Sequence, residues 1–138
     1  MAGRRFVDTN VLLYSVSRSP AEAGKRDRAI ALLASSDLAL STQVLQEFYV
    51  QATWSGRPDA LPHDLAAGLV QAWTRFPVQD VSLSIVMAAL DIRARYGFSY
   101  WDSAIIAAAQ AMDCRELLSE DMSHGQRVGR LRIVDPFR

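Results

Sequence analysis

Short apolar runs alternate along the chain with longer segments of helical periodicity, and this alternation is the feature that most constrains the fold. The apolar runs, which we expect to form strands, lie at about residues 6–7, 38–40, 78–81, 116–119 and 131–134. The main helical patterns lie at about residues 20–35, 42–54, 63–75, 84–96 and 100–112. Strands that alternate with helices of this length indicate a parallel sheet covered on both faces. The sequence therefore predicts an α/β fold: a single domain over residues 1–138, with about five parallel strands in a three-layer α/β/α arrangement.

Charge and cysteine content narrow the possible functions. The 138 residues carry 15 basic and 15 acidic side chains, a balance that is unusual for a nucleic-acid-binding domain. All the basic residues except Lys25 are Arg, however, and Arg pairs with phosphate and stacks on bases more readily than Lys. Cys114 is the only cysteine, which excludes a disulfide framework and suggests a reducing, cytoplasmic location. The apolar runs are too short for a membrane span, and the N-terminus reaches charged residues too soon to contain the apolar region of a signal peptide, so we expect neither.

Four acidic residues are candidates for a common functional site. Asp8 follows the first apolar run directly, and Asp121 follows the fourth closely, so both should lie near the carboxyl ends of parallel strands, where such sheets bind ligands. Asp102 begins an apolar helix, and Glu47 lies in the second turn of another. Each has an ordinary structural alternative: a turn or helix cap for Asp8, a capping box with Ser99 for Asp102, a solvated helix edge for Glu47 and a loop position for Asp121.

Taken together, the four acids point to a divalent metal ion. Carboxylates that share a partly desolvated site repel one another, so some must be protonated or a cation must enter. An all-oxygen donor set favours Mg²⁺ or Mn²⁺. His63, His124 and Cys114 lack partners at metal-ligand spacing, so a structural zinc site is not expected. Because Mg²⁺ is commonly shared between carboxylates and phosphate oxygens, the pattern predicts a phosphodiester site at which the metal activates water.

Four segments resemble, in the right order, the acidic motifs of the PIN-domain family, and most closely those of its VapC-type toxin branch. They are Phe6-Val7-Asp8-Thr9-Asn10-Val11-Leu12, Gln46-Glu47-Phe48, Trp101-Asp102-Ser103-Ala104-Ile105 and Leu118-Ser119-Glu120-Asp121-Met122-Ser123-His124-Gly125. The terminal Ile133-Val134-Asp135-Pro136-Phe137 is similar as well, so the resemblance covers nearly the whole chain. One departure is Ser103, where the family often has Ala.

The resemblance implies an Mg²⁺- or Mn²⁺-dependent endoribonuclease that is the toxin of a toxin–antitoxin pair, forms a homodimer and is held inactive by a cognate antitoxin. Carried over residue by residue, the catalytic acids are Asp8, Glu47, Asp102 and Asp121, and the supporting polar residues are Thr9, Asn10 and Ser119. We expect Asp8, Asp102 and Asp121 to hold the metal, and Glu47 to orient or deprotonate the attacking water. An Arg inserted by the antitoxin near the acids is a simple way to silence the site.

Three basic residues are candidates for contacts to the substrate. Arg127 and Arg130 follow the last acidic motif, and we expect them at the rim that binds RNA, although a solvated loop explains them equally well. Lys25 is another candidate phosphate contact.

Two rival functions remain open. The first is a catalytically idle PIN-like module that only binds RNA or protein. The second is an aspartyl-phosphate phosphatase, which is disfavoured because Asn10 replaces the second acid of its Asp-x-Asp motif and no lysine follows late in the chain.

Overall fold

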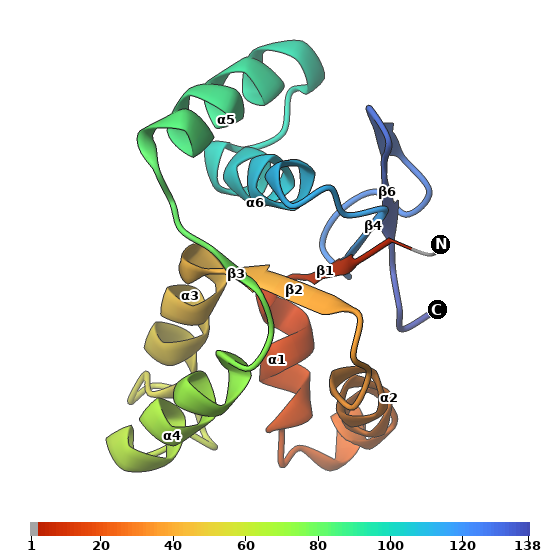
Figure 1. Cartoon of the computed structure of the whole chain (residues 1–138). Coiled ribbons are helices and arrows are strands. Elements are labelled where there is room, and N and C mark those ends of the chain that lie inside the picture. The colour runs from red at the N-terminus through yellow and green to blue at the C-terminus, as the bar shows by residue number, and fades with distance from the viewer. Residues whose placement is uncertain (1–2) are drawn as a thin grey trace.

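Six strands form one sheet in the computed structural model, which describes residues 3–138 (Figure 1). They are β1 Arg5–Val7, β2 Leu38–Ser41, β3 Val78–Gln79, β4 Glu116–Leu118, β5 Arg127–Val128 and β6 Leu131–Val134. Their order across the sheet is β3-β2-β1-β4-β6-β5, with β5 antiparallel to β6 and the other pairings parallel. The prediction of a mostly parallel sheet is therefore confirmed.

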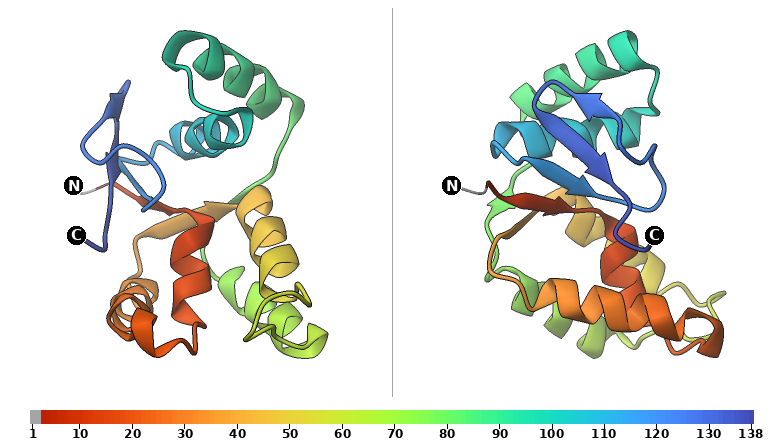
Figure 2. Two further views of the ribbon diagram at one scale, coloured as in Figure 1. Left: turned by 180° about the vertical axis from the view of Figure 1, so that it is seen from behind. Right: turned by 90° about the vertical axis from the view of Figure 1, so that its right-hand side faces the viewer.

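Helices cover both faces of this sheet (Figure 1, Figure 2). They are α1 Thr9–Ser15, α2 Ala23–Leu33, α3 Thr42–Ala52, α4 His63–Trp73, α5 Leu83–Tyr96 and α6 Tyr100–Ala111, with a short 3-10 helix, η1 Pro20–Glu22, ahead of α2. Helices α5 and α6 pack together on one face, whereas α1 to α4 lie on the other, which gives the predicted three layers. Within residues 3–138, each helix is too short or too polar to cross a membrane.

β5 is the strand that the sequence did not predict. It has only two residues, of which Arg127 is exposed and Val128 is buried, so no apolar run marks it. Gly129 follows with a φ of 60°, a left-handed conformation that glycine adopts without strain. This turn folds β5 back against β6 and pairs Val128 with Leu131.

The two innermost strands bring the first and last acidic motifs to the same place. β1 and β4 are parallel neighbours, and their register pairs Val7 with Leu118. Both residues are buried, and the chain continues from them into Asp8 and Ser119. On the same edge, the first turn of α6 carries Asp102, and α6 is held in place because its residues 103–109 are all buried.

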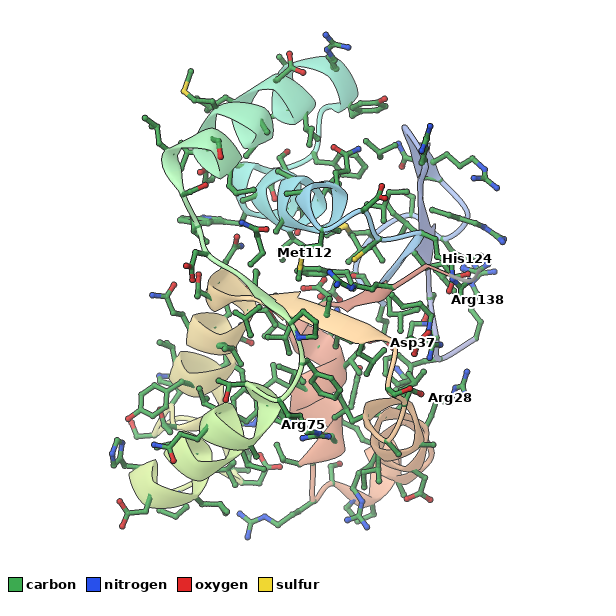
Figure 3. All side chains as sticks on the ribbon, in the orientation of Figure 1. Arg28, Asp37, Arg75, Met112, His124 and Arg138 are labelled. Carbon is green, nitrogen blue, oxygen red and sulfur yellow. The ribbon has the colours of Figure 1, made fainter. Side chains whose placement is uncertain are left out.

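Several arginines at the periphery of the fold connect separate segments through side-chain hydrogen bonds (Figure 3). Arg28 of α2 donates from Nε to the carbonyl oxygen of Pro136 (3.2 Å), and Arg75 donates from Nη2 to the carbonyl oxygen of Leu33 (3.0 Å). The side chain of Arg5 binds both carboxylate oxygens of Asp37, at 2.8 and 2.9 Å. Part of the large arginine content therefore stabilises the fold and is not available for a substrate.

Candidate active site

One small cavity at the carboxyl edge of the sheet contains all four predicted acids. Its volume is about 190 Å³, and its walls are formed by Asp8, Thr9, Asn10, Leu13, Glu47, Gln51, Asp102, Ile105 and Asp121. The acids come from four separate places: the end of β1, helix α3, the first turn of α6 and the loop after β4. The structure thus brings together carboxylates that are far apart in the sequence.

Asp8 is the most deeply buried of these acids, with 4% of its surface exposed. Its Oδ1 accepts a hydrogen bond from the backbone N of Thr9 (2.7 Å), so Asp8 is also the N-cap of α1. Its Oδ2 accepts from Ser119 Oγ (2.7 Å) and from Asn10 Nδ2 (3.4 Å). The helix cap that the sequence offered as an alternative therefore exists, and it coexists with a position in the acidic cavity.

The raised pKa values of two of the acids show that negative charge in the cavity is energetically unfavourable. Burial, together with the smaller effect of the charges of Glu47 and Asp121, raises the pKa of Asp8 to about 7 despite the hydrogen bonds from Ser119 and Thr9. Burial also raises the pKa of Asp102, and the same two carboxylates add to the effect. A cation in the cavity would favour the ionised form of each acid.

The polar residues predicted to support the acids lie between them. Thr9 Oγ1 donates to Glu47 Oε1 (2.6 Å), and Asn10 Nδ2 donates to Asp121 Oδ2 (3.2 Å) as well as to Asp8. Ser119 Oγ accepts from the backbone N of Asp121 (3.2 Å) while it donates to Asp8. Hydrogen bonds from these neutral donors thus offset part of the cost of burying the carboxylates.

Gln43 is a candidate site residue that the sequence did not single out. Its Nε2 donates to Glu47 Oε2 (3.2 Å) and to the carbonyl oxygen of Trp101 (3.1 Å), so it connects α3 to the start of α6. Gln43 is buried and lies one helical turn before Glu47, a spacing that places the two side chains on one face. That spacing is the signal that could have identified it. Gln51 lies one turn after Glu47 and lines the cavity.

The donor set suits a hard divalent cation, but the acids are not arranged as a complete cage. Carboxylate oxygens are the ligands that Mg²⁺ and Mn²⁺ prefer. Over residues 3–138, no three Asp, Glu, His or Cys side chains are grouped closely enough to hold a metal ion as they stand. The cavity therefore fits an ion that takes some of its ligands from these carboxylates and the rest from water, as Mg²⁺ usually does.

Glu120, next to Asp121, does not line this cavity and is neutralised by Lys25. Lys25 Nζ and the Tyr14 hydroxyl each bind one oxygen of Glu120, both at 2.5 Å. Although burial acts to raise the pKa of Glu120, these two hydrogen bonds lower it. The only lysine of the chain therefore holds the loop that carries Asp121, which corrects the expectation that Lys25 contacts phosphate.

Arg127 and Arg130 lie toward the amino end of β4, whereas the acids lie at the carboxyl ends of the strands. This corrects the expectation that the two arginines form the rim of the acidic site. Arg127 pairs with Arg132, and Arg132 is level with Glu116, the first residue of β4. The acids follow the last residues of β1 and β4 instead. The physical reason is the direction of β5, which runs antiparallel and carries the chain away from Asp121 before it turns at residues 129–130.

The PIN domain family model matches residues 5–127, a segment that contains all four acids. The chain belongs to the PIN-domain family. Among curated proteins, none matches the sequence significantly.

Several solved structures share the fold of this PIN domain. Mycobacterium tuberculosis VapC20, described as a sarcin–ricin loop cleaving toxin, has a TM-score of 0.67 and 20% identity over 85% of this chain and 91% of its own. A toxin–antitoxin complex from Klebsiella pneumoniae has a TM-score of 0.68 and 21% identity over 96% and 97%. FitAcB from Neisseria gonorrhoeae has a TM-score of 0.70 and 15% identity over 96% and 98%. At these identities the similarity establishes a common fold over nearly the full chain.

Ser119→Ala should raise the pKa of Asp8 above its value of about 7, because Ser119 donates the hydrogen bond that favours the ionised carboxylate most strongly. NMR titration of the Asp8 side-chain carboxyl carbon in the metal-free PIN domain measures this pKa. Ser123→Ala is the matched control, since Ser123 is an exposed serine of the same loop, and it should leave the titration unchanged. An Asp8 pKa that is the same in wild type and Ser119→Ala would contradict the role given to this hydrogen bond.

Proposed function

We propose that this PIN domain is a divalent-metal-dependent endoribonuclease that cleaves RNA phosphodiester bonds and is the toxin of a toxin–antitoxin pair. The observation that carries the proposal is the cavity in which carboxylates from four elements meet, with the pKa of Asp8 raised to about 7. Such a site is unfavourable unless a cation enters it. The common fold with VapC20, a sarcin–ricin loop cleaving toxin, supports RNA as the substrate.

The acids and their neighbours have different roles in this proposal. Asp8, Asp102 and Asp121 would hold Mg²⁺ or Mn²⁺, which when bound stabilises charge that develops on the phosphate and lowers the pKa of water. Glu47 is the residue that orients or deprotonates the attacking water. Its two carboxylate oxygens are each held by one donor, Thr9 Oγ1 and Gln43 Nε2, so its direction is fixed before the substrate arrives.

The acidic cavity is also where we propose that a cognate antitoxin places an Arg. The toxin–antitoxin complex from Klebsiella pneumoniae and VapBC from Salmonella typhimurium share this fold, which supports the class of partner. A guanidinium remains charged at any pH relevant to proteins and binds carboxylates through two parallel hydrogen bonds. It would therefore relieve the repulsion between the acids while excluding the metal. Full inhibition by an antitoxin whose Arg residues have been replaced would contradict this part of the proposal.

The exposed apolar face of α5 supports the proposed homodimer. Leu83, Met87 and Leu90 are 77%, 59% and 50% exposed, and their spacing places them on one stripe of the helix. Apolar stripes of this kind mark interaction surfaces, and a second copy of the chain would cover this one. Light scattering of the purified protein measures the oligomeric state directly.

The geometry does not favour an aspartyl-phosphate phosphatase. Its nucleophile would be Asp8, but both oxygens of Asp8 already accept hydrogen bonds from Thr9 and Ser119 in a buried position. The lysine that such an enzyme needs is absent from the cavity, because Lys25 is paired with Glu120.

Incubation of the purified protein with total RNA, with and without Mg²⁺ or Mn²⁺, tests the proposed function. Mapping of the new 5′ ends shows where cleavage occurs. We expect new ends at defined positions only when divalent metal is present. RNA binding without new ends under any metal condition would instead support an idle binding module and overturn the proposal.

A further inference from the structure

A second and larger cavity lies beyond the acidic one and has no role in the functions described so far. Its volume is about 860 Å³, and its walls include Arg18, Glu22, Trp54, Arg57 and Asp59. A smaller cavity of about 170 Å³ connects the two: it shares Glu22 and Arg57 with the large cavity and Asp121 with the acidic one. The shared lining residues place the three cavities in a row that leads from the acids to the segment between α3 and α4.

Trp54 provides a fixed aromatic wall for the large cavity, which we call the Trp54 cavity. Its side chain is 64% exposed, although tryptophan is usually largely buried. The indole lies directly against Gly56, where an added Cβ would come within 2.5 Å of ring carbon Cζ2. The backbone therefore supports one part of the ring while much of it stays open. An exposed, supported indole is a suitable surface on which an unpaired nucleobase stacks.

Hydrogen-bond donors and acceptors surround the indole in balanced numbers. Arg57 Nε is paired with Asp59 Oδ1 (3.0 Å), and Asp59 Oδ2 accepts from the backbone N of Arg18 (3.2 Å). Glu22 Oε1 accepts from Ser17 Oγ (2.6 Å). The guanidinium of Arg18 makes none of the salt bridges found across residues 3–138. The cavity is thus lined by two guanidinium groups and two carboxylates, and it carries no formal excess of positive charge.

This balance distinguishes recognition of a base from recognition of a phosphate. A phosphate site gains its affinity from net positive charge, which the Trp54 cavity lacks. A base edge instead presents donors and acceptors side by side, and side chains of both kinds are needed to bind it. An aromatic face with guanidinium and carboxylate groups around it meets both requirements.

We propose that the Trp54 cavity binds the base of a nucleotide near the cleaved phosphodiester and makes cleavage base-specific; this inference rests on the proposed ribonuclease function. The base stacks on Trp54, Arg18 donates to its acceptor atoms, and Glu22 or Asp59 accepts from its N–H groups. Guanine fits best, because it offers O6 and N7 to a guanidinium and N1–H and N2–H to a carboxylate. The expected consequence is a preference for guanine at one fixed position relative to the cleaved bond.

Cleavage of a randomised single-stranded RNA pool in Mg²⁺, followed by sequencing of the products, tests this inference. We expect wild type to enrich guanine at one position near the new ends. Trp54→Ala and Arg18→Ala should each reduce that preference roughly tenfold, whereas Trp54→Phe should largely keep it because it retains a stacking face. Tyr96→Ala is the matched control, since it removes an exposed aromatic residue from α5 and should leave the preference unchanged.

A binding measurement makes the test independent of cleavage. Fluorescence anisotropy compares the affinity of Asp8→Asn protein for short single-stranded RNAs that differ by one guanine, with and without the additional Trp54→Ala change. We expect Trp54→Ala to remove a roughly tenfold preference for the guanine-containing RNA. The same base preference with and without Trp54 in both measurements would overturn the inference. A wild-type protein that binds guanine through Trp54 but cleaves no RNA would overturn the proposed function and leave this binding site standing.

Discussion

Asp8→Asn should lower the rate of RNA cleavage about 1,000-fold or more while leaving the fold intact. A catalytic metal ion contributes several kcal/mol to the stabilisation of the transition state, and each 1.36 kcal/mol corresponds to a factor of ten in rate. Asp8 is the acid at the centre of the hydrogen-bond network, with Ser119 and Asn10 both donating to Oδ2. Replacing its charge by a neutral amide removes a proposed metal ligand without changing the size of the side chain.

Asp27→Asn is the matched control for this experiment. Asp27 lies on α2 with its side chain 77% exposed and contributes nothing to the acidic cavity. We expect it to cleave RNA at the wild-type rate. Circular dichroism and RNA binding should be the same for wild type and both variants, which separates loss of chemistry from loss of structure. A wild-type cleavage rate in Asp8→Asn would remove Asp8 from the catalytic site.

The same Asp8→Asn substitution should stabilise the metal-free protein at pH 8 by about 1–3 kcal/mol. The pKa of Asp8 is raised from its ordinary value of 3.8 to about 7 in the folded chain, so the folded state binds a proton that the unfolded state releases. Ionisation of Asp8 therefore opposes folding: its cost is absent below about pH 4, grows as the pH rises and is complete above about pH 7.

The gain from the substitution is smaller than the full cost of ionising Asp8. The whole shift corresponds to about 4 kcal/mol at high pH. Asparagine has a single acceptor oxygen, however, for the donors from Thr9 and Ser119 that Asp8 binds with two, and an unsatisfied buried donor costs about 1–3 kcal/mol. The net gain at pH 8 is the difference between these two effects.

Urea denaturation in EDTA at pH 4, 6 and 8 measures this effect. The free energy of unfolding of wild type should fall relative to that of Asp8→Asn as the pH rises, and the advantage of the variant should disappear toward pH 4. Asp27→Asn should follow the wild-type curve. A difference between wild type and Asp8→Asn that does not change with pH would show that Asp8 titrates near its ordinary value.

The sequence predicted the parts of the fold and site that depend on local signals. An apolar run followed at once by Asp8, and another followed by Ser119 and Asp121, identified strand ends, and parallel pairing of β1 with β4 placed them side by side. The four acids were recognised in order because the short segment around each one resembles a motif of the PIN-domain family. Ser41 is likewise a local signal for the start of α3, and Gly97 is one for the end of α5.

The parts that the sequence could not predict depend on the direction of distant segments. Arg127 is close to Asp121 along the chain, but the antiparallel course of β5 separates them in space. The spacing of Gln43 from Glu47 is a local signal, but its hydrogen bond to the carbonyl of Trp101, 58 positions later, is encoded by no local pattern. The exposure of Trp54, in contrast to the burial of Trp73, depends on how the segment around Gly56 folds back against the indole.

The rate of cleavage of one defined RNA in EDTA, and again as Mg²⁺ is added back, tests most directly whether the four acids form a metal-dependent centre. We predict no cleavage in EDTA by wild type and recovery of cleavage as Mg²⁺ is restored, with no recovery in Asp8→Asn. Cleavage by wild type in EDTA at the rate seen with Mg²⁺ would contradict the central claim that this cavity cleaves RNA with a divalent metal ion.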